Sequence, residues 1–394
     1  QSLMISIAVG TGVGVNAVLS RSLGEKDARM ADESAKNGIF LAFVSCVVFA
    51  VLGVLLAKPF FHMQTADTQI REYGIQYMTI ISALCIAVYM QVMFERLLQS
   101  TGRTFYTMIS QGLGAVINII FDPILIFGLL GFSENGGFAG AAAATVLGQF
   151  CGMFLAMFFN IRFNKDIHIG MRNFRPSGRI IKVIYSVGVP SIIMQAIGSV
   201  MTFGMNKILL MFSSTAAAVF GVYFKLQSFI FMPVFGLNNG MIPIIAYNYG
   251  ARNKKRITQA AKLSVLIAVT IMIIGLIIFQ TCSGFLLKNL FDASENMLSI
   301  GVPALRIISL SFLFAGYCII VGSVFQALGN GVYSLIVSVA RQLLVILPVA
   351  YLFARFFGLS MVWWSIPIAE IVSVILSTLL LRRIYRLKVK PLEG

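Results

Sequence analysis

An amide, an acid and a proline lie close together in one apolar run of the sequence, Asn118-Ile119-Ile120-Phe121-Asp122-Pro123. Asn118 and Asp122 are four residues apart, so both would lie on one face of a helix. Pro123 has no N–H and clashes with the Ile119 carbonyl, which would leave that carbonyl free beside the carboxylate. Together these groups could hold a proton or a small cation. Alternatively, the carboxylate of Asp122 braces the proline kink by hydrogen bonds.

A hydroxyl in the next apolar run is placed to join this group. Thr145 follows a short loop and would lie at a depth similar to that of Asp122. Its hydroxyl could complete a cation site with Asn118 and Asp122. The alternative for Thr145 is a hydrogen bond to the backbone of its own helix.

A second acid, Glu370, lies within the last apolar run, and Arg341 lies in the run before it. A charged side chain at the centre of a membrane helix costs roughly 2.5–3.5 kcal/mol on insertion scales, so each one is a candidate functional residue. The two long side chains could meet. We therefore predict either a polar site in the second half of the chain or a structural ion pair that holds this half together.

Groups for enzymatic chemistry are scarce. The two histidines, His62 and His168, fall in different loops, and the five cysteines form no CxxC pair. We find no nucleophile triad, phosphate loop or metal-ligand cluster. The sequence thus predicts a protein that is not an enzyme, with no catalytic residue and no cofactor beyond a coupling ion. The one metal we consider is Na⁺ at Asp122.

These polar residues sit in an unusually apolar chain. Of its 394 residues 58% are hydrophobic and 11% are charged, whereas soluble domains carry about 25% charged residues. A membrane-spanning helix needs about 20 apolar residues. The sequence offers eleven such runs: 1–20, 37–57, 73–94, 104–130, 138–160, 181–212, 222–248, 262–282, 300–326, 331–355 and 361–381. We predict an all-α membrane protein.

The basic residues indicate the orientation. The net charge of +16 comes from Lys and Arg in short connections, so it does not indicate nucleic-acid binding. Alternate connections carry 22 basic residues on one side of the membrane and 4 on the other. Because cytoplasmic loops are enriched in Lys and Arg, we expect the long 161–182 connection and the C-terminus to be cytoplasmic, in a multi-pass protein of the plasma (inner) membrane.

The chain also contains an internal repeat. Shifts of 226 and 227 positions align residues at equivalent points of equivalent runs, with a smaller shift toward the end of each half. The matched pairs include Gly10 with Gly236, Gly14 with Gly240, Lys36 with Lys262, Gln99 with Gln326, Gly102 with Gly329 and Tyr106 with Tyr333. We therefore predict two parallel lobes, 1–160 and 181–385, joined by a cytoplasmic loop, 161–180. The run 181–212 has no counterpart in the first copy, so we expect the parent protein to carry one further helix upstream and to have 6 + 6 spans.

Several segments together resemble the multidrug and toxic compound extrusion (MATE) family over the whole chain. They are Gly236–Gly240, Tyr247–Ala251, Ser20–Gly24, Gln99–Gly102, Asn118–Pro123 and Trp363–Glu370. The resemblance implies two six-helix lobes, a central cavity open alternately to each side, and drug export driven by inward H⁺ or Na⁺. It also implies a cation site of an Asn and an Asp four apart on the fifth helix, matched by Asn118 and Asp122, with a hydroxyl of the sixth helix, matched by Thr145.

Two departures from the family pattern bear on coupling. The family site also uses an Asp on the first helix, which this sequence lacks, and the acids that some members carry on the seventh and tenth helices are absent from 181–212 and 300–326. We therefore expect coupling to rest on the first lobe and this sequence alone to be inactive or impaired.

The predicted function is cation-coupled export of amphipathic or cationic organic compounds by a monomer in the lipid bilayer. The alternatives are a lipid-linked oligosaccharide flippase, which would need several deep cationic residues, and a membrane-embedded transferase, which would need clustered acids or histidines at a membrane face.

Overall fold

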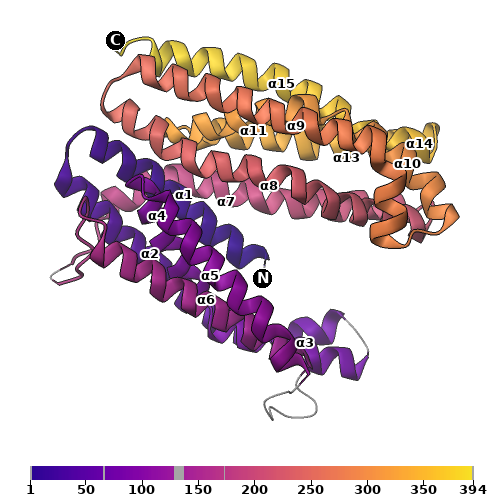
Figure 1. The fold of residues 1–394 in the computed structure, drawn as a ribbon, viewed down its shortest axis with the longest axis horizontal. Helices are drawn as coiled ribbons and strands as arrows, with labels where there is room; N and C mark the ends of the chain where they lie inside the picture. The colour runs from indigo at the N-terminus through magenta and orange to yellow at the C-terminus, as the bar shows by residue number, and fades with distance from the viewer. Residues whose placement is uncertain (1, 65–66, 128–136, 173, 393–394) are drawn as a thin grey trace. The chain divides into compact units, whose positions relative to one another are not determined.

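The computed structural model describes residues 2–64, 67–127, 137–172 and 174–392, and every regular element within these ranges is helical (Figure 1). The chain divides into two compact units, Gln1–Ile192 and Ile193–Gly394, called here the first and second units. The division falls inside one long helix, α7 (Gly178–Leu210). The predicted all-α fold is thus confirmed for the described residues.

The first unit holds six helices besides the start of α7. They are α1 (Ser2–Gly24), α2 (Ala28–Gln64), α3 (Thr68–Ala83), α4 (Ile86–Ser100), α5 (Thr104–Ile126) and α6 (Gly137–Arg162). Helix α4 packs against α1, α2, α5 and α6, which makes it the central helix of this unit. Its second half is buried almost continuously, from Met93 to Ser100.

The second unit continues with α7 and ten further segments. They are α8 (Ser214–Gly250), α9 (Lys254–Phe291), α10 (Glu295–Ser309), α11 (Phe312–Ala327), α12 (Gly331–Val339), η1 (Ala340–Ile346), α13 (Leu347–Phe356), α14 (Leu359–Val362), α15 (Ser365–Ile384) and η2 (Tyr385–Val389). The segments η1 and η2 are π-helices. Helix α11 packs against α8, α9, α12 and α15.

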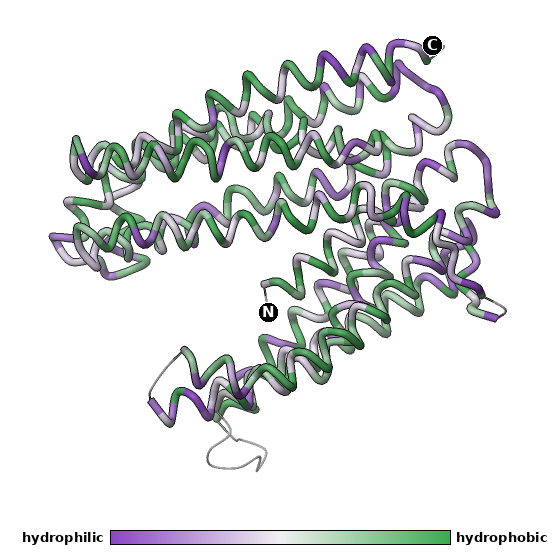
Figure 2. Tube along the Cα trace, turned by 180° about the vertical axis from the view of Figure 1, so that it is seen from behind, coloured by the Kyte–Doolittle hydropathy of each residue, from purple (hydrophilic) through white to green (hydrophobic). Residues whose placement is uncertain are grey.

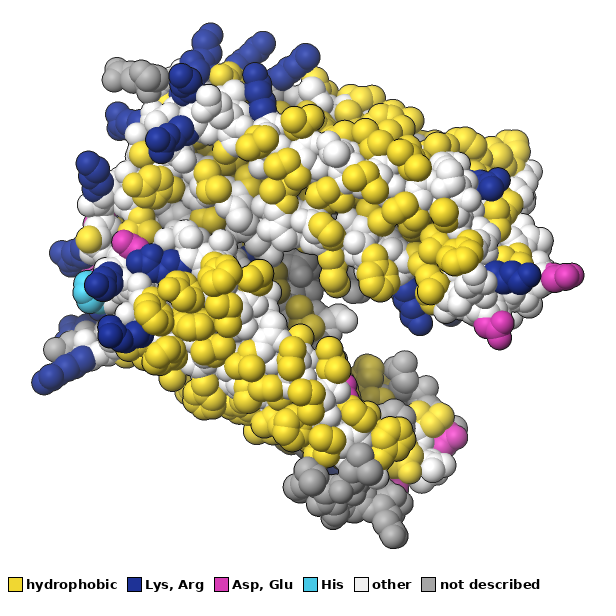
Figure 3. Space-filling view, in the orientation of Figure 1, with side chains coloured by type: hydrophobic (Ala, Val, Ile, Leu, Met, Phe, Trp, Pro, Cys, Tyr) yellow, Lys and Arg dark blue, Asp and Glu magenta, His cyan; other side chains and the backbone are white. Residues whose placement is uncertain are grey.

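The described helices are long and apolar enough to cross a membrane. Nine qualify singly, and eleven qualify if each of two bent pairs, α3 with α4 and α10 with α11, forms one span. Helices α5 and α2 are the clearest cases, because only 11% and 17% of their most apolar windows are buried inside the protein. Figure 2 shows hydrophobic stretches along the helices of each unit and hydrophilic residues mainly near their ends. Apolar side chains likewise cover the outer face of the helices in Figure 3. A bilayer solvates such surfaces, whereas water does not.

The internal repeat is present in the backbone. The break between α3 and α4 bends the pair by 45°, and the break between α10 and α11 bends that pair by 50°. Gly102 and Gly329, which the repeat aligns, end α4 and α11 with φ of +76° and +74°. Lys26 and Arg252, also aligned, have φ of 60° and 56°. Because positive φ is uncommon outside glycine, these matches indicate two copies of one helical unit.

Glycine allows a close helix contact in the first unit. A Cβ on Gly10 would lie 2.8 Å from the Ile192 backbone nitrogen, and one on Gly14 would overlap the Ile184 carbonyl oxygen. Helices α1 and α7 therefore approach at backbone distance here, as small residues permit in membrane helices. A Cβ added to either of the aligned glycines, Gly236 or Gly240, would meet no atom within 4 Å. The close contact thus belongs to one copy of the repeat, because in the second copy these glycines face open space.

Candidate functional site

A small cavity lined by several polar side chains lies between α4, α5 and α6 in the first unit. Its volume is about 270 Å³. It is lined by amide, hydroxyl and small side chains: Gln91, Gln111, Gly114, Ala115, Asn118, Thr145, Gly148 and Gln149. The cavity includes two of the three residues predicted to form a cation site.

Asn118 and Thr145 lie side by side in this cavity. Asn118 Nδ2 is 3.5 Å from Thr145 Oγ1, across 27 positions of sequence. The Thr145 hydroxyl donates to the Ala141 carbonyl, 3.0 Å away on its own helix. The alternative considered for Thr145, a hydrogen bond to its own helix, is thus present, and the hydroxyl keeps lone pairs for another partner.

Asp122 lies one helical turn beyond Asn118 on α5, which continues through Pro123 to Ile126. The side chain is half-buried, and among the described residues its Oδ1 atom is buried without a hydrogen-bond partner. This oxygen therefore does not brace the proline kink. Leaving such an atom unpartnered costs about 1–3 kcal/mol.

The structure adds an acid that the sequence pattern does not single out. Glu95 lies in α4 and is 4% exposed. Its carboxylate accepts from Gln111 Nε2 at 2.7 Å and from Gln91 Nε2 at 3.0 Å, and Ser110 Oγ lies 3.5 Å away. The signal that could have found it is Gln91, four residues before Glu95 and on the same helix face.

Arg96 is one of the 22 basic residues assigned from the sequence to the connections on one side of the membrane, and the structure places it elsewhere. The sequence pattern places it in the turn after the third span, but it is buried in α4 and 7% exposed. Arg96 Nη1 donates to Gln99 Oε1 at 2.9 Å, and its stem fills the space beside Gly12. The apolar run ends before these residues in the sequence, whereas the helix and its packing continue to Ser100.

In the second unit Arg341 and Glu370 do meet. Arg341 Nη1 donates to Glu370 Oε1 at 2.9 Å, with the two side chains 26% and 7% exposed. The other carboxylate oxygen, Oε2, is buried and has no hydrogen-bond partner among the described residues. Arg341 lies in the π-helix η1, a widened turn often found at functional sites.

The cavity and the ion pair occupy equivalent places in the repeat. The shift of 227 carries Gly114 onto Arg341. Gly114 contacts Gly148 on α6, where a Cβ on Gly148 would lie 2.5 Å from the Gly114 carbonyl oxygen. Arg341 contacts Glu370 on α15, the helix that corresponds to α6. The first unit thus has Gly114 and Gly148 beside a cavity at the place where the second unit has the ion pair of Arg341 and Glu370.

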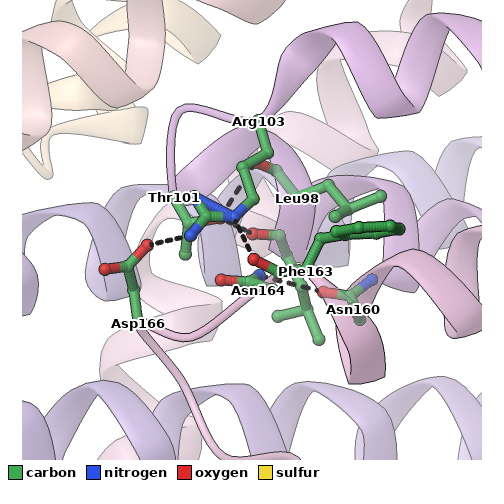
Figure 4. Close-up of polar contacts among 8 residues, drawn as sticks. Leu98, Thr101, Arg103, Asn160, Phe163, Asn164 and Asp166 are labelled. Atoms are coloured by element: carbon green, nitrogen blue, oxygen red, sulfur yellow. Dashed lines mark hydrogen bonds and ion pairs between the residues drawn. The ribbon is translucent and has the colours of Figure 1, made fainter.

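The loop between α6 and α7 is fixed to the first unit by polar contacts (Figure 4). Arg103 donates from Nε to the Phe163 carbonyl at 3.0 Å and pairs with Asp166 at 3.0 Å. Nearby, Asn164 Nδ2 donates to Asn160 Oδ1 at 3.1 Å. The backbone N–H of His168 donates to Asp32 at 2.7 Å. This loop packs as part of the first unit.

The described residues include no cluster of three or more His, Cys, Asp or Glu that could hold a metal ion. The two histidines lie at surfaces, where His62 is 3.3 Å from Arg71 and His168 is 3.3 Å from Asp32.

Comparison with known proteins identifies the architecture. The sequence model of the family described as MatE matches residues 1–124 and 190–352. Multidrug export protein MepA of Staphylococcus haemolyticus is 27% identical over 367 residues, which cover 93% of this chain and 79% of the relative. MepA of Staphylococcus aureus (strain MRSA252) is 26% identical over 366 residues, covering 91% of this chain and 78% of the relative.

Solved structures agree with these relatives. An outward-facing multidrug resistance MATE family transporter of the MOP superfamily superposes with a TM-score of 0.92 at 26% identity, covering 98% of this chain and 86% of that chain. A MOP superfamily transporter from Pyrococcus furiosus, described as having a binding pocket of reverse polarity, gives 0.90 at 26% identity, covering 100% and 86%.

Proposed function

Because the chain belongs to the MatE family of membrane transporters, we propose that it exports amphipathic or cationic organic compounds by alternating access, driven by inward flow of H⁺ or Na⁺. Family membership makes the protein a multi-pass membrane transporter and not an enzyme. Export of organic compounds is supported by the MepA relatives, which are named multidrug export proteins.

The observation that carries the coupling proposal is the group around Asn118. Asn118 and Thr145 face one cavity, and the next turn of α5 carries a carboxylate with a buried, unpartnered oxygen. Pro123 contributes no N–H to the helix, which deprives the Ile119 carbonyl of its usual donor. An unsatisfied carboxylate oxygen close to further oxygen atoms is what a proton or Na⁺ needs.

The second unit supports the assignment of coupling to the first. Its charged pair already neutralises itself, since Arg341 is bound to Glu370. This pairing also weighs against the flippase alternative. The deep basic residues of the described chain, Arg341 and Arg96, are engaged by Glu370 and Gln99, so neither is preset to bind a pyrophosphate.

We further propose that the protein lies in the plasma membrane with its C-terminus in the cytoplasm. The support is the distribution of Lys and Arg, which crowd one end of each unit in Figure 3 while apolar side chains cover its middle. Basic residues are retained on the cytoplasmic side during insertion.

The function is tested by transport measurements on the natural gene product in proteoliposomes. A fluorescent organic cation is loaded, and a pH gradient and a Na⁺ gradient are imposed separately. We expect one of the two gradients to drive the cation against its concentration difference. Equal transport by liposomes with and without both gradients would rule out cation coupling, and no transport of any organic cation would rule out the substrate class.

A further inference from the structure

We propose that Glu95 is a second proton-binding group of the first unit, connected to Asp122 through the polar cavity. This inference deepens the proposed function and rests on it for its role in transport. The proton binding itself is a property of the residues around Glu95 and is tested separately.

Glu95 is a buried acid without an ion-pair partner. No basic group lies within 4 Å of its carboxylate among the described residues, and its hydrogen bonds come from neutral groups, Gln91, Gln111 and Ser110. Burying a charge without an ion-pair partner is costly, so burial favours the protonated form of this group.

No neighbouring charge forms an ion pair with Glu95 in the described structure. Arg96 follows Glu95 on α4 and its positive charge acts on the carboxylate from a distance, while its guanidinium donates to Gln99. The helices packed against α4 are α1, α2, α5 and α6. Their charged and histidine residues are Arg21 on α1, Asp122 on α5, Arg162 on α6, and on α2 Arg29, Asp32, Glu33, Lys36, Lys58 and His62. None of them forms an ion pair with Glu95 in the described structure, and most lie near helix ends.

The surroundings of Glu95 suit a proton better than Na⁺. The amide nitrogens of Gln91 and Gln111 point at the carboxylate, whereas Na⁺ would need oxygen ligands. A glutamine can turn its amide so that Oε1 faces the carboxyl group instead. The same two side chains can therefore donate to the carboxylate and, after it has taken a proton, accept from the carboxylic acid.

Polar side chains on one face of α5, with Gly114 and Ala115 between them, lead from Glu95 toward Asp122. Gln111 contacts Glu95 and also lines the cavity, as Asn118 does. Gln111, Asn118 and Asp122 are spaced seven and four residues apart, so they follow one face of the helix. The eleven residues from Gln111 to Asp122 correspond to about 16 Å of helix.

The cavity between them has room for water. At about 30 Å³ per molecule of liquid water, its volume of about 270 Å³ accommodates several, and its amide and hydroxyl lining offers them partners. A hydronium ion in the cavity would give its proton to a Glu95 oxygen and become neutral water, and on release the proton would form hydronium again and pass toward Asp122. No covalent bond other than O–H is formed or broken.

Comparison of the two copies of the repeat shows that the helix contact at position 95 does not depend on the Glu95 side chain. Thr107 Oγ1 donates to the Glu95 carbonyl at 3.3 Å, and Ser334 Oγ donates to the Gly322 carbonyl at 2.6 Å. The shift of 227 carries the first pair onto the second. The helix contact is therefore made with glycine at this position, so the carboxylate of Glu95 is not required for it.

The direct test is infrared difference spectroscopy of the purified natural protein between acidic and alkaline buffer, comparing wild type with Glu95→Gln. We expect the wild type to show a slowly exchanging carboxylic-acid band that Glu95→Gln loses and Glu25→Gln, at an exposed acid, keeps. If properly folded Glu95→Gln keeps the whole band, the proposal is wrong. Should Glu95→Gln fold poorly, Gln111→Leu supplies the same test, because removing the stronger donor must shift that band.

A second measurement addresses transport. Drug-induced proton release is followed with a pH indicator in weak buffer for wild type, Glu95→Gln, Asp122→Asn and the double variant. We expect each single variant to release fewer protons and the double variant to release none, with drug binding retained. Unchanged release from Glu95→Gln would remove Glu95 from the relay. A wild type that loses its infrared band with Glu95 but releases no protons would instead contradict the proposed function.

Discussion

Arg341 and Glu370 are joined by a 2.9 Å hydrogen-bonded ion pair within the second unit, from a π-helix to the helix α15. Such a buried pair need not stabilise a fold, because removing two charges from water costs several kcal/mol each. Removing only one partner is destabilising, because the remaining charge stays buried and unpaired. Single and double substitutions of the pair distinguish these two effects.

We predict that Arg341→Met or Glu370→Leu alone lowers the free energy of unfolding by roughly 3–5 kcal/mol, whereas the double variant recovers most of that loss. Thermal unfolding in detergent measures all three variants and the wild type. A double variant that is as unstable as the sum of the singles would show that the two residues do not act as a pair.

Asp122 and Glu370 should differ in what their neutralisation affects. We predict that Asp122→Asn abolishes gradient-driven efflux while drug binding survives, because its buried, unpartnered oxygen is the proposed cation ligand. Glu370→Gln should lower expression or stability more than coupling, since Glu370 is held by Arg341. Efflux and binding are compared at matched protein levels. Normal pumping by Asp122→Asn together with a stalled Glu370→Gln would move coupling to the second unit.

The close contact between Gly114 and Gly148 can be tested by substitution, with Gly112 on the same helix as a control. A Cβ on Gly148 would lie 2.5 Å from the Gly114 carbonyl oxygen, and a backbone atom cannot rotate away. Gly148→Ala should therefore push α5 from α6 and lower the unfolding temperature. Gly112, on the same α5, has nothing within 4 Å, so Gly112→Ala should be neutral or slightly stabilising, by up to about 1 kcal/mol. Equal effects of the two substitutions would contradict the observed packing.

The orientation is tested by labelling single cysteines in a background without the native five. Arg172→Cys probes the loop after α6, and Asn296→Cys probes the start of α10; both positions are exposed. A membrane-impermeant thiol reagent added to intact cells should label position 296 and leave position 172 unlabelled. The reverse pattern would show that the basic loops face outward.

The sequence pattern locates the apolar runs and the repeat but not all of the buried polar groups. Asn118 and Asp122 can be grouped from the sequence because they are four residues apart, and Thr145 joins them because it lies at a matching depth in the next span. For Glu95 the sequence offers only Gln91 four residues before it, which does not show that Glu95 is buried. It lies at the polar end of an apolar run, where a charged residue normally belongs to a loop, and only the packing of four helices around α4 removes it from water.

The sequence by itself determined that this protein spans a membrane as a twofold helical repeat, because about 20 consecutive apolar residues have few other stable environments. It also restricted the candidate site to a few ionisable and amide residues, since every such group inside a bilayer is costly. Only the tertiary structure decided which of them meet. Contacts such as Gln111 with Glu95 and Arg341 with Glu370 join different helices, and the rotation and tilt of one helix against another depend on side-chain packing that periodicity does not contain.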